Sequence, residues 1–343
     1  MTTSEHEILK AVDLCAPDGR TLNPPAKGWS RQILHRANLA GRWGRTKRWD
    51  YWAIQADSII VAITVADIDY LGLVTLDWID PVSHHSGGRS VTIPLGRGID
   101  LPDEPATGRL DFDSHNLGVS IVYGDDATEL LAHWTEKHGT TGTLSATVAE
   151  PTGHESLNVV IPWSSTRFQF TSKHQARPAF GAITTEGRTQ EFGGPAGEAW
   201  GILDVGRGRW PYQTRWNWGG GSGYASTGDL VGLQIGGKWT DGTGFTENGV
   251  ILNGRLSKIG EDLTWEYDWD NPMNPWRVRN AEGTLDVTLR PGHDRHSNLN
   301  LGILMNEVHQ VFGHWSGYVP DGAGAALSID NVLGFAEEAR ARW

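Results

Sequence analysis

Two pairs of ionisable residues follow apolar runs that alternate with the period of a strand, and both pairs could transfer protons. In IIVAITVADIDYLGL, every second side chain of Ile59–Val65 forms an apolar row that continues into Asp67 and Asp69. Such neighbours lie about 7 Å apart, so burial would raise the pKa of at least one carboxyl. The opposite face is also mostly apolar. If that face is the inward one, the two Asp residues point outward and Tyr70 becomes the polar group inside.

The second pair lies near the C-terminus, in LNLGILMNEVHQVFGHW. An apolar row from Leu299 to Met305 is expected to run along one strand into Glu307 and His309. A carboxylate beside an imidazole is a general acid and base. The alternative for both pairs is a position past the rim of the sheet, where the side chains serve loop hydrogen bonds.

Several possible metal ligands surround the second pair. They are His293, Asp294, His296, His309 and His314. Strand alternation sends His309 and His314 to opposite faces, so the sequence predicts no metal site.

Aromatic residues, glycines and isolated polar groups alternate between Trp216 and Trp269. Rings give a pocket rigid apolar walls, glycine allows close approach, and a few polar groups orient a ligand. This stretch and nearby polar or aromatic residues predict the substrate-binding positions. These positions are Tyr70, Trp216, Asn217, Trp218, Gln234, Lys238, Trp239, Glu247, His314 and Trp315.

Composition excludes several classes of protein. The 343 residues carry a formal net charge of −12, which disfavours nucleic acid and anionic membrane surfaces as partners. Cys15 is the only cysteine, which favours a reducing compartment. A secretory leader and an apolar run long enough to span a membrane are both missing, so we expect a soluble cytoplasmic protein. The glycine-rich GRGRWPY and GGGSGY match no phosphate-binding loop, and no cofactor is predicted.

Periodicity predicts an all-β protein. Short alternating or apolar runs are separated by turn residues, as in an antiparallel sandwich or barrel. Asn253-Gly254 is the clearest hairpin turn, and Asp241-Gly242 is a second turn signal. The expected strands are Ile59–Val65, Leu71–Trp78, Ser90–Pro94, Gly118–Tyr123, Thr143–Ala149, Leu157–Ile161, Val231–Trp239, Val250–Leu252, Arg255–Ile259, Leu285–Leu289 and Leu299–Met305.

A weak internal repeat indicates two comparable halves. RWDYW at Arg48–Trp52 and RWNWG at Arg215–Gly219 each open a series of strands punctuated by glycine. The segment TTEGRTQEFGGP is expected to connect them. The predicted domains are therefore residues 1–185 and 186–343.

Long motifs along nearly the whole chain resemble one family. GRWGRTKRWDYWAI, ADIDYLG, LDVGRGRWPYQTRWNWGGGSG, VGLQIGGKWTDGTGFTENG and NEVHQVFGHWSG followed by GFAE are similar to the DUF2804 family. More distantly, the chain resembles two-domain lipocalin-like enzymes that include carotenoid hydratases, tocopherol cyclase and fungal cyclases. That resemblance implies two packed β-barrel halves, a hydrophobic substrate, and protonation, dehydration or cyclisation without a redox cofactor.

Three functions are consistent with these residues. The first is a cofactor-independent acid-base enzyme, a hydratase, dehydratase, cyclase or isomerase, acting on a terpenoid- or polyketide-like molecule. In it, Asp67 or Asp69 donates a proton and Glu307 or His309 relays the second one, while tryptophan faces stabilise cationic character. The second is a non-catalytic carrier or sensor of a hydrophobic molecule. The third is a carbohydrate-binding or glycoside-cleaving protein.

Overall fold

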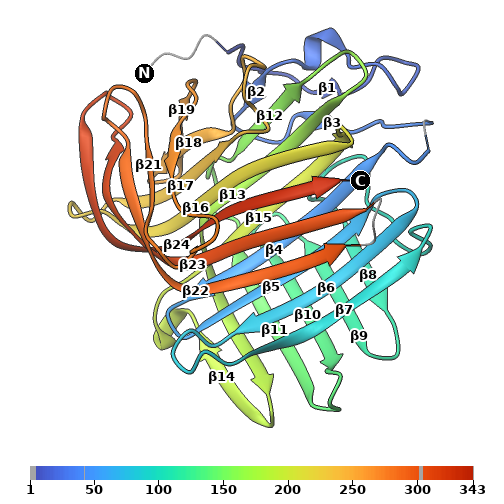
Figure 1. Ribbon diagram of the computed structural model, residues 1–343, viewed down its shortest axis with the longest axis vertical. Helices are drawn as coiled ribbons and strands as arrows, with labels where there is room; N and C mark the ends of the chain where they lie inside the picture. The colour runs from blue at the N-terminus through green and yellow to red at the C-terminus, as the bar shows by residue number, and fades with distance from the viewer. Residues whose placement is uncertain (1–4, 42, 301–303, 343) are drawn as a thin grey trace.

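The computed structural model describes residues 5–41, 43–300 and 304–342. The predicted all-β class is confirmed: within these residues, helix is limited to two short 3-10 turns, η1 (Pro24–Ala26) and η2 (Gly194–Ala196). No helix in the described ranges is long and apolar enough to cross a membrane. Two large antiparallel sheets, each curled into a half-barrel, form the molecule (Figure 1).

The first sheet has thirteen strands among the described residues. Its central path runs β7-β6-β5-β4-β15-β13-β11-β10-β9-β8, with β12 and β14 pairing β13 and with β2 pairing β12. The strands are β2 (Trp29–Ser30), β4 (Lys47–Ala56), β5 (Ile59–Asp67), β6 (Leu71–Ile79), β7 (Ser86–Pro94), β8 (Arg109–Asp113), β9 (Leu117–Tyr123), β10 (Ala127–Thr135), β11 (Thr141–Ala149), β12 (Leu157–Pro162), β13 (Phe168–Thr185), β14 (Arg188–Phe192) and β15 (Ala199–Arg209). A separate parallel pair joins β1 (Val12–Asp13) and β3 (His35–Arg36).

The second sheet has nine strands among the described residues, in the order β19-β18-β17-β16-β24-β23-β22-β21-β20. The strands are β16 (Gln213–Tyr224), β17 (Leu230–Gly237), β18 (Asn248–Leu252), β19 (Arg255–Ile259), β20 (Thr264–Glu266), β21 (Trp276–Arg279), β22 (Asp286–Asn300), β23 (Met305–Pro320) and β24 (Ala326–Arg342). Both sheets follow one plan. Each contains a meander of four consecutive strands, β4–β7 in the first sheet and β16–β19 in the second. The first strand of each meander also pairs with the last strand of its sheet along the chain, β4 with β15 and β16 with β24. The RWDYW and RWNWG motifs occupy these equivalent strands.

The chain passes from one sheet to the other between Arg209 and Gln213, later than the expected boundary after residue 185. The segment TTEGRTQEFGGP, which was expected to link two domains, instead contains a hairpin of the first sheet. Thr185 pairs with Arg188 across Glu186-Gly187, and β14 and β15 both pair with β13 of the first sheet. Both turn residues have positive φ, 53° and 75°, as a two-residue hairpin turn requires.

Other local signals have mixed outcomes. Asn253-Gly254 forms the predicted hairpin, with φ values of 47° and 81° and Leu252 paired with Arg255. The expected strand Leu299–Met305 is wrong, because Asn300 ends β22 and Met305 begins β23, while residues 301–303 lie outside the described residues. The apolar row proposed to lead into Glu307 therefore does not exist on one strand, and Leu299 is exposed.

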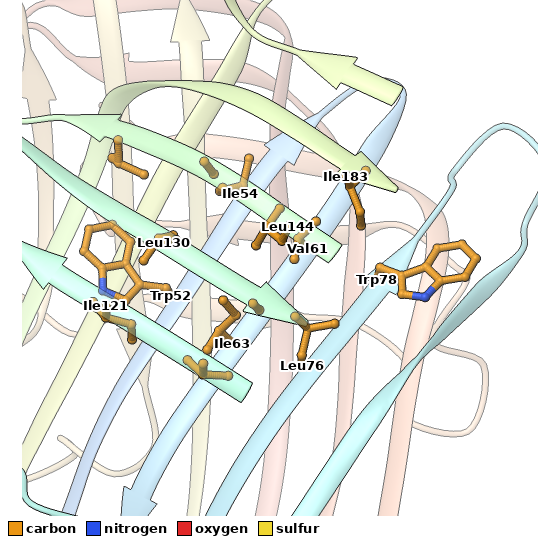
Figure 2. Packing of buried hydrophobic residues seen from close by; sticks show 14 of the residues in the cluster. Trp52, Ile54, Val61, Ile63, Leu76, Trp78, Ile121, Leu130, Leu144 and Ile183 are labelled. Carbon is orange, nitrogen blue, oxygen red and sulfur yellow. The ribbon is translucent and has the colours of Figure 1, made fainter. Parts of the chain in front are cut away.

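Side chains from the first sheet fill its own hollow. Trp52, Ile54, Val61, Ile63 and Leu76 pack there against residues of β9, β10 and β11, as Figure 2 shows. The row Ile59–Val65 points into this core, as the first of the two sequence alternatives requires. A second core fills the curl of the other sheet, around Trp276, Leu289 and Trp315.

The opposite face of β5 is buried as well, because the two sheets pack against each other. Ile60 and Ala62 belong to a cluster with Trp218, Phe312 and Phe335 of the second sheet. In Figure 1 the long orange and red strands β22–β24 run across β4–β6, and β24 contacts β4. Both faces of β5 are thus buried, one in the core of the first sheet and the other between the two sheets.

Candidate functional site

The two sheets meet in the cluster around Ile60, Ala62, Trp218, Phe312 and Phe335, which we call the intersheet layer. Charged residues enter this layer from both sheets. On the first sheet, the register places Lys173 of β13 beside Asp204 of β15, and Asp204 beside Tyr51 of β4. On the second sheet, Trp218, Glu337, Gln310 and Arg295 form one row across β16, β24, β23 and β22. Since each row consists of direct cross-strand neighbours, sheet pairing alone fixes which polar groups meet.

Lys173 is the cation at the centre of the cluster. Its Nζ lies 3.0 Å from Oδ1 of Asp204 and 3.4 Å from Oε2 of Glu247, which comes just before β18. It also lies 4.1 Å from the centre of the Trp218 ring. A buried ammonium needs such partners, because an isolated charge in an apolar layer is strongly disfavoured.

Each of three buried carboxylates accepts a hydrogen bond from one indole N–H. Trp49 donates to Asp204 over 3.1 Å and Trp239 donates to Glu247 over 2.5 Å. Trp216 donates to Oε1 of Glu337 over 2.7 Å. An indole N–H donates only, so these bonds fix the carboxyl positions without supplying a group that competes for a proton.

Burial and charge give the acids different proton affinities. Burial raises the pKa of Glu337 to about 7, although the Trp216 N–H and the charge of Lys173 oppose this shift. Burial also raises the pKa of Glu247, against the effect of Lys173. Burial alone would lower the pKa of Lys173, but Asp204 and Glu247 outweigh it and raise the pKa. Asp204 and Glu247 lie within ion-pair distance of the Lys173 ammonium, whereas Glu337 is affected by the charges of Lys173 and Arg295 only from further away, and burial raises its pKa to about 7.

Solvent still reaches parts of the cluster. Asp204 and Glu337 each remain 7% exposed and Lys173 remains 5% exposed, whereas Glu247 is 1% exposed. Next to the cluster, tryptophans from both sheets pack together: Trp210 stacks on Trp239 at 5.0 Å and meets Trp216 edge-on at 5.6 Å. Trp49, Trp163 and Trp216 are half-buried and form the outer side of this aromatic layer.

Five sequence-predicted binding residues meet in this layer. Trp216, Trp218, Trp239 and Glu247 are described above, and Gln234 accepts the Trp218 N–H over 3.0 Å.

The other five predicted binding residues lie elsewhere. Asn217 and Lys238 both contact Tyr267 on the opposite face of the second sheet. Trp315 is in the second core and donates to the carbonyl of Gly220, while His314 pairs with exposed Asp57. Tyr70 accepts a hydrogen bond from Lys47 over 3.1 Å.

Asp67 and Asp69 lie at the β5–β6 turn. Oδ2 of Asp69 accepts the backbone N–H groups of Arg45 and Thr46, and Oδ1 of Asp67 accepts the N–H of Asp69. Asp69 has a φ of 71°, so it forms part of the turn itself. Burial raises the pKa of Asp67, opposed by the Asp69 N–H. Both carboxylates therefore hold loop backbone, which matches the alternative reading of this pair.

Glu307 and His309 share one face of β23 in the second sheet. Nδ1 of His309 lies 2.7 Å from Oδ2 of Asp294, and Oε1 of Glu307 lies 3.4 Å from Nε2 of His296. They face away from the intersheet layer, since Val308 and Gln310 alternate with them and Gln310 contacts Tyr51 of β4. The structure does not bring this pair together with Asp67 and Asp69.

Sequence reasoning missed Lys173, Asp204 and Glu337. Each interrupts a strand that is buried on both faces, as in AWGILDVGRGR of β15, where all eleven residues are buried. Charged residues within such a buried run were the available sign, because a buried charge requires a partner.

Hollows on the described surface include two that are not lined by the tryptophans of the intersheet layer. The larger, about 690 Å³, lies between the β6–β7 edge, the β10–β11 turn and β22, and it includes Asp77, Glu136, His293 and His296. The smaller, about 110 Å³, includes Val65, Ile99 and Phe112.

Two curled antiparallel half-barrels packed around a buried polar layer define a two-sheet, lipocalin-like class of all-β protein. The model of the domain of unknown function DUF2804 matches residues 5–343, and the chain belongs to this family. No curated protein matches the sequence significantly.

Two solved structures are among those to which this chain is similar. Kievitone hydratase from Nectria haematococca has a TM-score of 0.51 and 11% identity, with 88% of this chain and 89% of that chain covered. CghA in complex with Sch210972 has a TM-score of 0.45 and 10% identity, with 87% and 88% covered. At these identities the likeness concerns the fold.

Proposed function

We propose that this protein is an acid-base enzyme that adds water to, removes water from, or cyclises a hydrophobic small molecule, with Glu337 as the proton donor. One observation carries the proposal: a buried carboxyl with a pKa of about 7 is held by an indole N–H beside a lysine–carboxylate cluster. General acids work best when their pKa lies near the working pH. The fold is shared with a protein named as a hydratase, which agrees with this class of reaction.

The proton inventory of the cluster suits such chemistry. Glu337 in its protonated form transfers a proton to an alkene carbon or a leaving hydroxyl, and its carboxylate remains. Water or an internal nucleophile then attacks the resulting cation, and Asp204 accepts the proton that the nucleophile releases. Lys173 holds Asp204 in place by an ion pair, with its ammonium 3.0 Å from Oδ1. In dehydration, Glu337 protonates the leaving hydroxyl, water departs, and Asp204 accepts the proton that the neighbouring carbon loses.

The tryptophans favour an apolar substrate with cationic character in the transition state. Trp49, Trp163 and Trp216 present half-buried rings beside the acids. Aromatic faces attract cations and exclude water, which protects a carbocation from unspecific capture. Glu337 and Asp204 replace Asp67 and Asp69 as the proposed acid and base, because Asp67 and Asp69 accept backbone hydrogen bonds at a turn.

The test starts from the substrate that the protein itself selects. Native mass spectrometry of protein purified from its own host identifies a co-purified apolar molecule. That molecule and related alkenes and alcohols of terpenoid and polyketide type are then incubated with the protein in D2O. We expect a gain or loss of water or an isomer, with deuterium at the protonated carbon, and we expect Glu337→Gln to abolish the product.

Asp67→Asn is the control. It neutralises a half-buried carboxyl at the end of β5 that accepts a backbone hydrogen bond at a turn, and it is expected to keep the product. Product formation by folded Glu337→Gln would refute Glu337 as the donor. Tight binding of the molecule without conversion by the wild type would identify a carrier instead.

A further inference from the structure

A second group of ionisable side chains lies on the face of the second sheet that points away from the intersheet layer. His296 of β22 and His309 of β23 are direct cross-strand partners, and their rings stack with centres 4.2 Å apart. Glu307 lies two residues from His309 and therefore on the same face. The register pairs Glu307 with Asn298, so all three side chains meet at one end of the β22–β23 ribbon.

The potential ligand atoms of these three residues converge. One nitrogen of each histidine and one carboxylate oxygen of Glu307 all lie within 4.8 Å of one another. Tetrahedral zinc with bonds of about 2.0–2.1 Å needs ligand atoms roughly 3.4 Å apart, so the site closes when the His296 ring turns out of its stack with His309 and both rings point at one metal. His296 is free to make this rotation, because its side chain is 44% exposed.

Neighbouring residues orient the ligands as outer partners of a metal do. Nδ1 of His309 is 2.7 Å from Oδ2 of Asp294, which leaves Nε2 for a metal. The Asn298 amide donates to Oε1 of Glu307 over 3.1 Å. The Trp269 ring meets His309 edge-on at 4.6 Å and limits its rotation.

We infer that His296, Glu307 and His309 bind a divalent transition-metal ion of the zinc class, with Asp294 positioning His309. Two imidazoles and one carboxylate are a donor set that zinc uses in sites with an open fourth position. Strand alternation argued against a site built from His309 and His314. The second imidazole comes instead from the facing strand, which the spacing along the chain does not reveal.

The surrounding charges permit a cation. Arg340 lies opposite Glu307 on β24, but its Nε is 2.8 Å from Glu338, and its guanidinium lies over the Trp269 ring. Asp294 and Glu307 provide negative charge at the site. Asp294 and His296 also line the hollow of about 690 Å³, so the open metal position has access to a small molecule or water.

The experiment measures metal binding by the full chain. Protein stripped with a chelator is titrated with Zn2+ by calorimetry, and Co2+ serves as a spectroscopic probe of geometry. We expect one tight equivalent per chain. Asp294→Asn is expected to weaken Zn2+ binding about 10- to 100-fold, and His296→Ala, His309→Ala and Glu307→Gln are expected to weaken it further.

His314→Ala is the matched control, because His314 lies on the same strand but on the other face and pairs with Asp57. Circular dichroism of each metal-free variant verifies the fold. The inference fails if the wild type takes up no equivalent of Zn2+, if binding survives His309→Ala, or if His314→Ala weakens it equally. None of these readouts depends on Glu337, so this result and that of the proposed reaction are separable.

Discussion

The indole nitrogen of Trp216 lies 2.7 Å from Oε1 of Glu337, and the bond joins neighbouring strands β16 and β24. A donor to a carboxylate favours the ionised form, and the Trp216 bond lowers the pKa of Glu337 against the larger effect of burial. We therefore expect Trp216→Phe, which keeps a ring but removes the N–H, to raise this pKa above about 7. Difference infrared spectroscopy of the carboxyl C=O band against pH measures it.

The band is assigned by its loss in Glu337→Gln. Trp210→Phe serves as the comparison, since Trp210 packs in the same layer but its indole N–H donates to Gln169. A Glu337 titration that is unchanged in Trp216→Phe would show that this bond does not tune the acid.

Glu337 also makes stability depend on pH. Its pKa rises from 4.5 in the unfolded chain to about 7 in the fold, so the folded state holds the proton more tightly. The stabilisation from protonation is full below about pH 4.5 and is lost as pH rises through 7, by about 3 kcal/mol in the unfolding free energy. Denaturant titrations at pH 5 and pH 8 should show a smaller decline in Glu337→Gln than in the wild type. Equal declines would contradict the raised pKa.

Lys173 stabilises two buried carboxylates at once. Lys173→Met keeps the side-chain length but leaves Asp204 and Glu247 without their ammonium, which should cost about 3–5 kcal/mol near neutral pH. Without the cation the pKa of Glu247, which burial raises and Lys173 lowers, rises further in the fold, so acidification to pH 5 should recover part of the loss. Urea unfolding at both pH values tests this. A variant equally unstable at pH 5 and pH 7.5 would argue against a charge effect.

Gly236 makes room for the Glu247 carboxyl. A Cβ at this position would collide with the Glu247 side chain, which Trp239 and Lys173 hold in place. Gly236→Ala is expected to cost about 1–3 kcal/mol and to displace the carboxyl from Trp239. The indole Nε1–H signal of Trp239 in ¹H–¹⁵N spectra, assigned with Trp239→Phe, should shift upfield.

Gly223→Ala on β16 is the control, because its new Cβ meets Val332 at an ordinary 3.4 Å. If the Trp239 signal stays in place in Gly236→Ala, Glu247 has another position available.

The all-β class and many strand positions were readable in the sequence because alternation and turn residues are local. In β11, for example, buried Leu144, Ala146 and Val148 alternate with more exposed neighbours, and the strand was expected at Thr143–Ala149. The join near residue 300 was misread, since Leu299 and Met305 share an apolar, alternating pattern in the sequence but belong to the separate strands β22 and β23.

The walls of the candidate site were predicted better than its acids. Trp216, Trp218 and Trp239 come from one glycine-rich segment whose composition is distinctive. Lys173, Asp204 and Glu337 come from three distant strands and meet only through sheet pairing and the packing of one sheet on the other. No spacing along the chain encodes such a meeting. Asp67 and Asp69 stood out by alternation, yet their hydrogen bonds are to backbone groups of a loop.

The pairing of each sheet's first meander strand with its last has a consequence for how the chain folds. β4 can find β15 once residue 209 has been synthesised, so the first half-barrel can form before the second begins. β16 must wait for β24, which ends at Arg342. Glu337 lies on β24, so the acid cluster is completed only after the strands of both half-barrels have been synthesised. Pairings this distant fold slowly, and the open edge of β16 is exposed to misassociation in the interval.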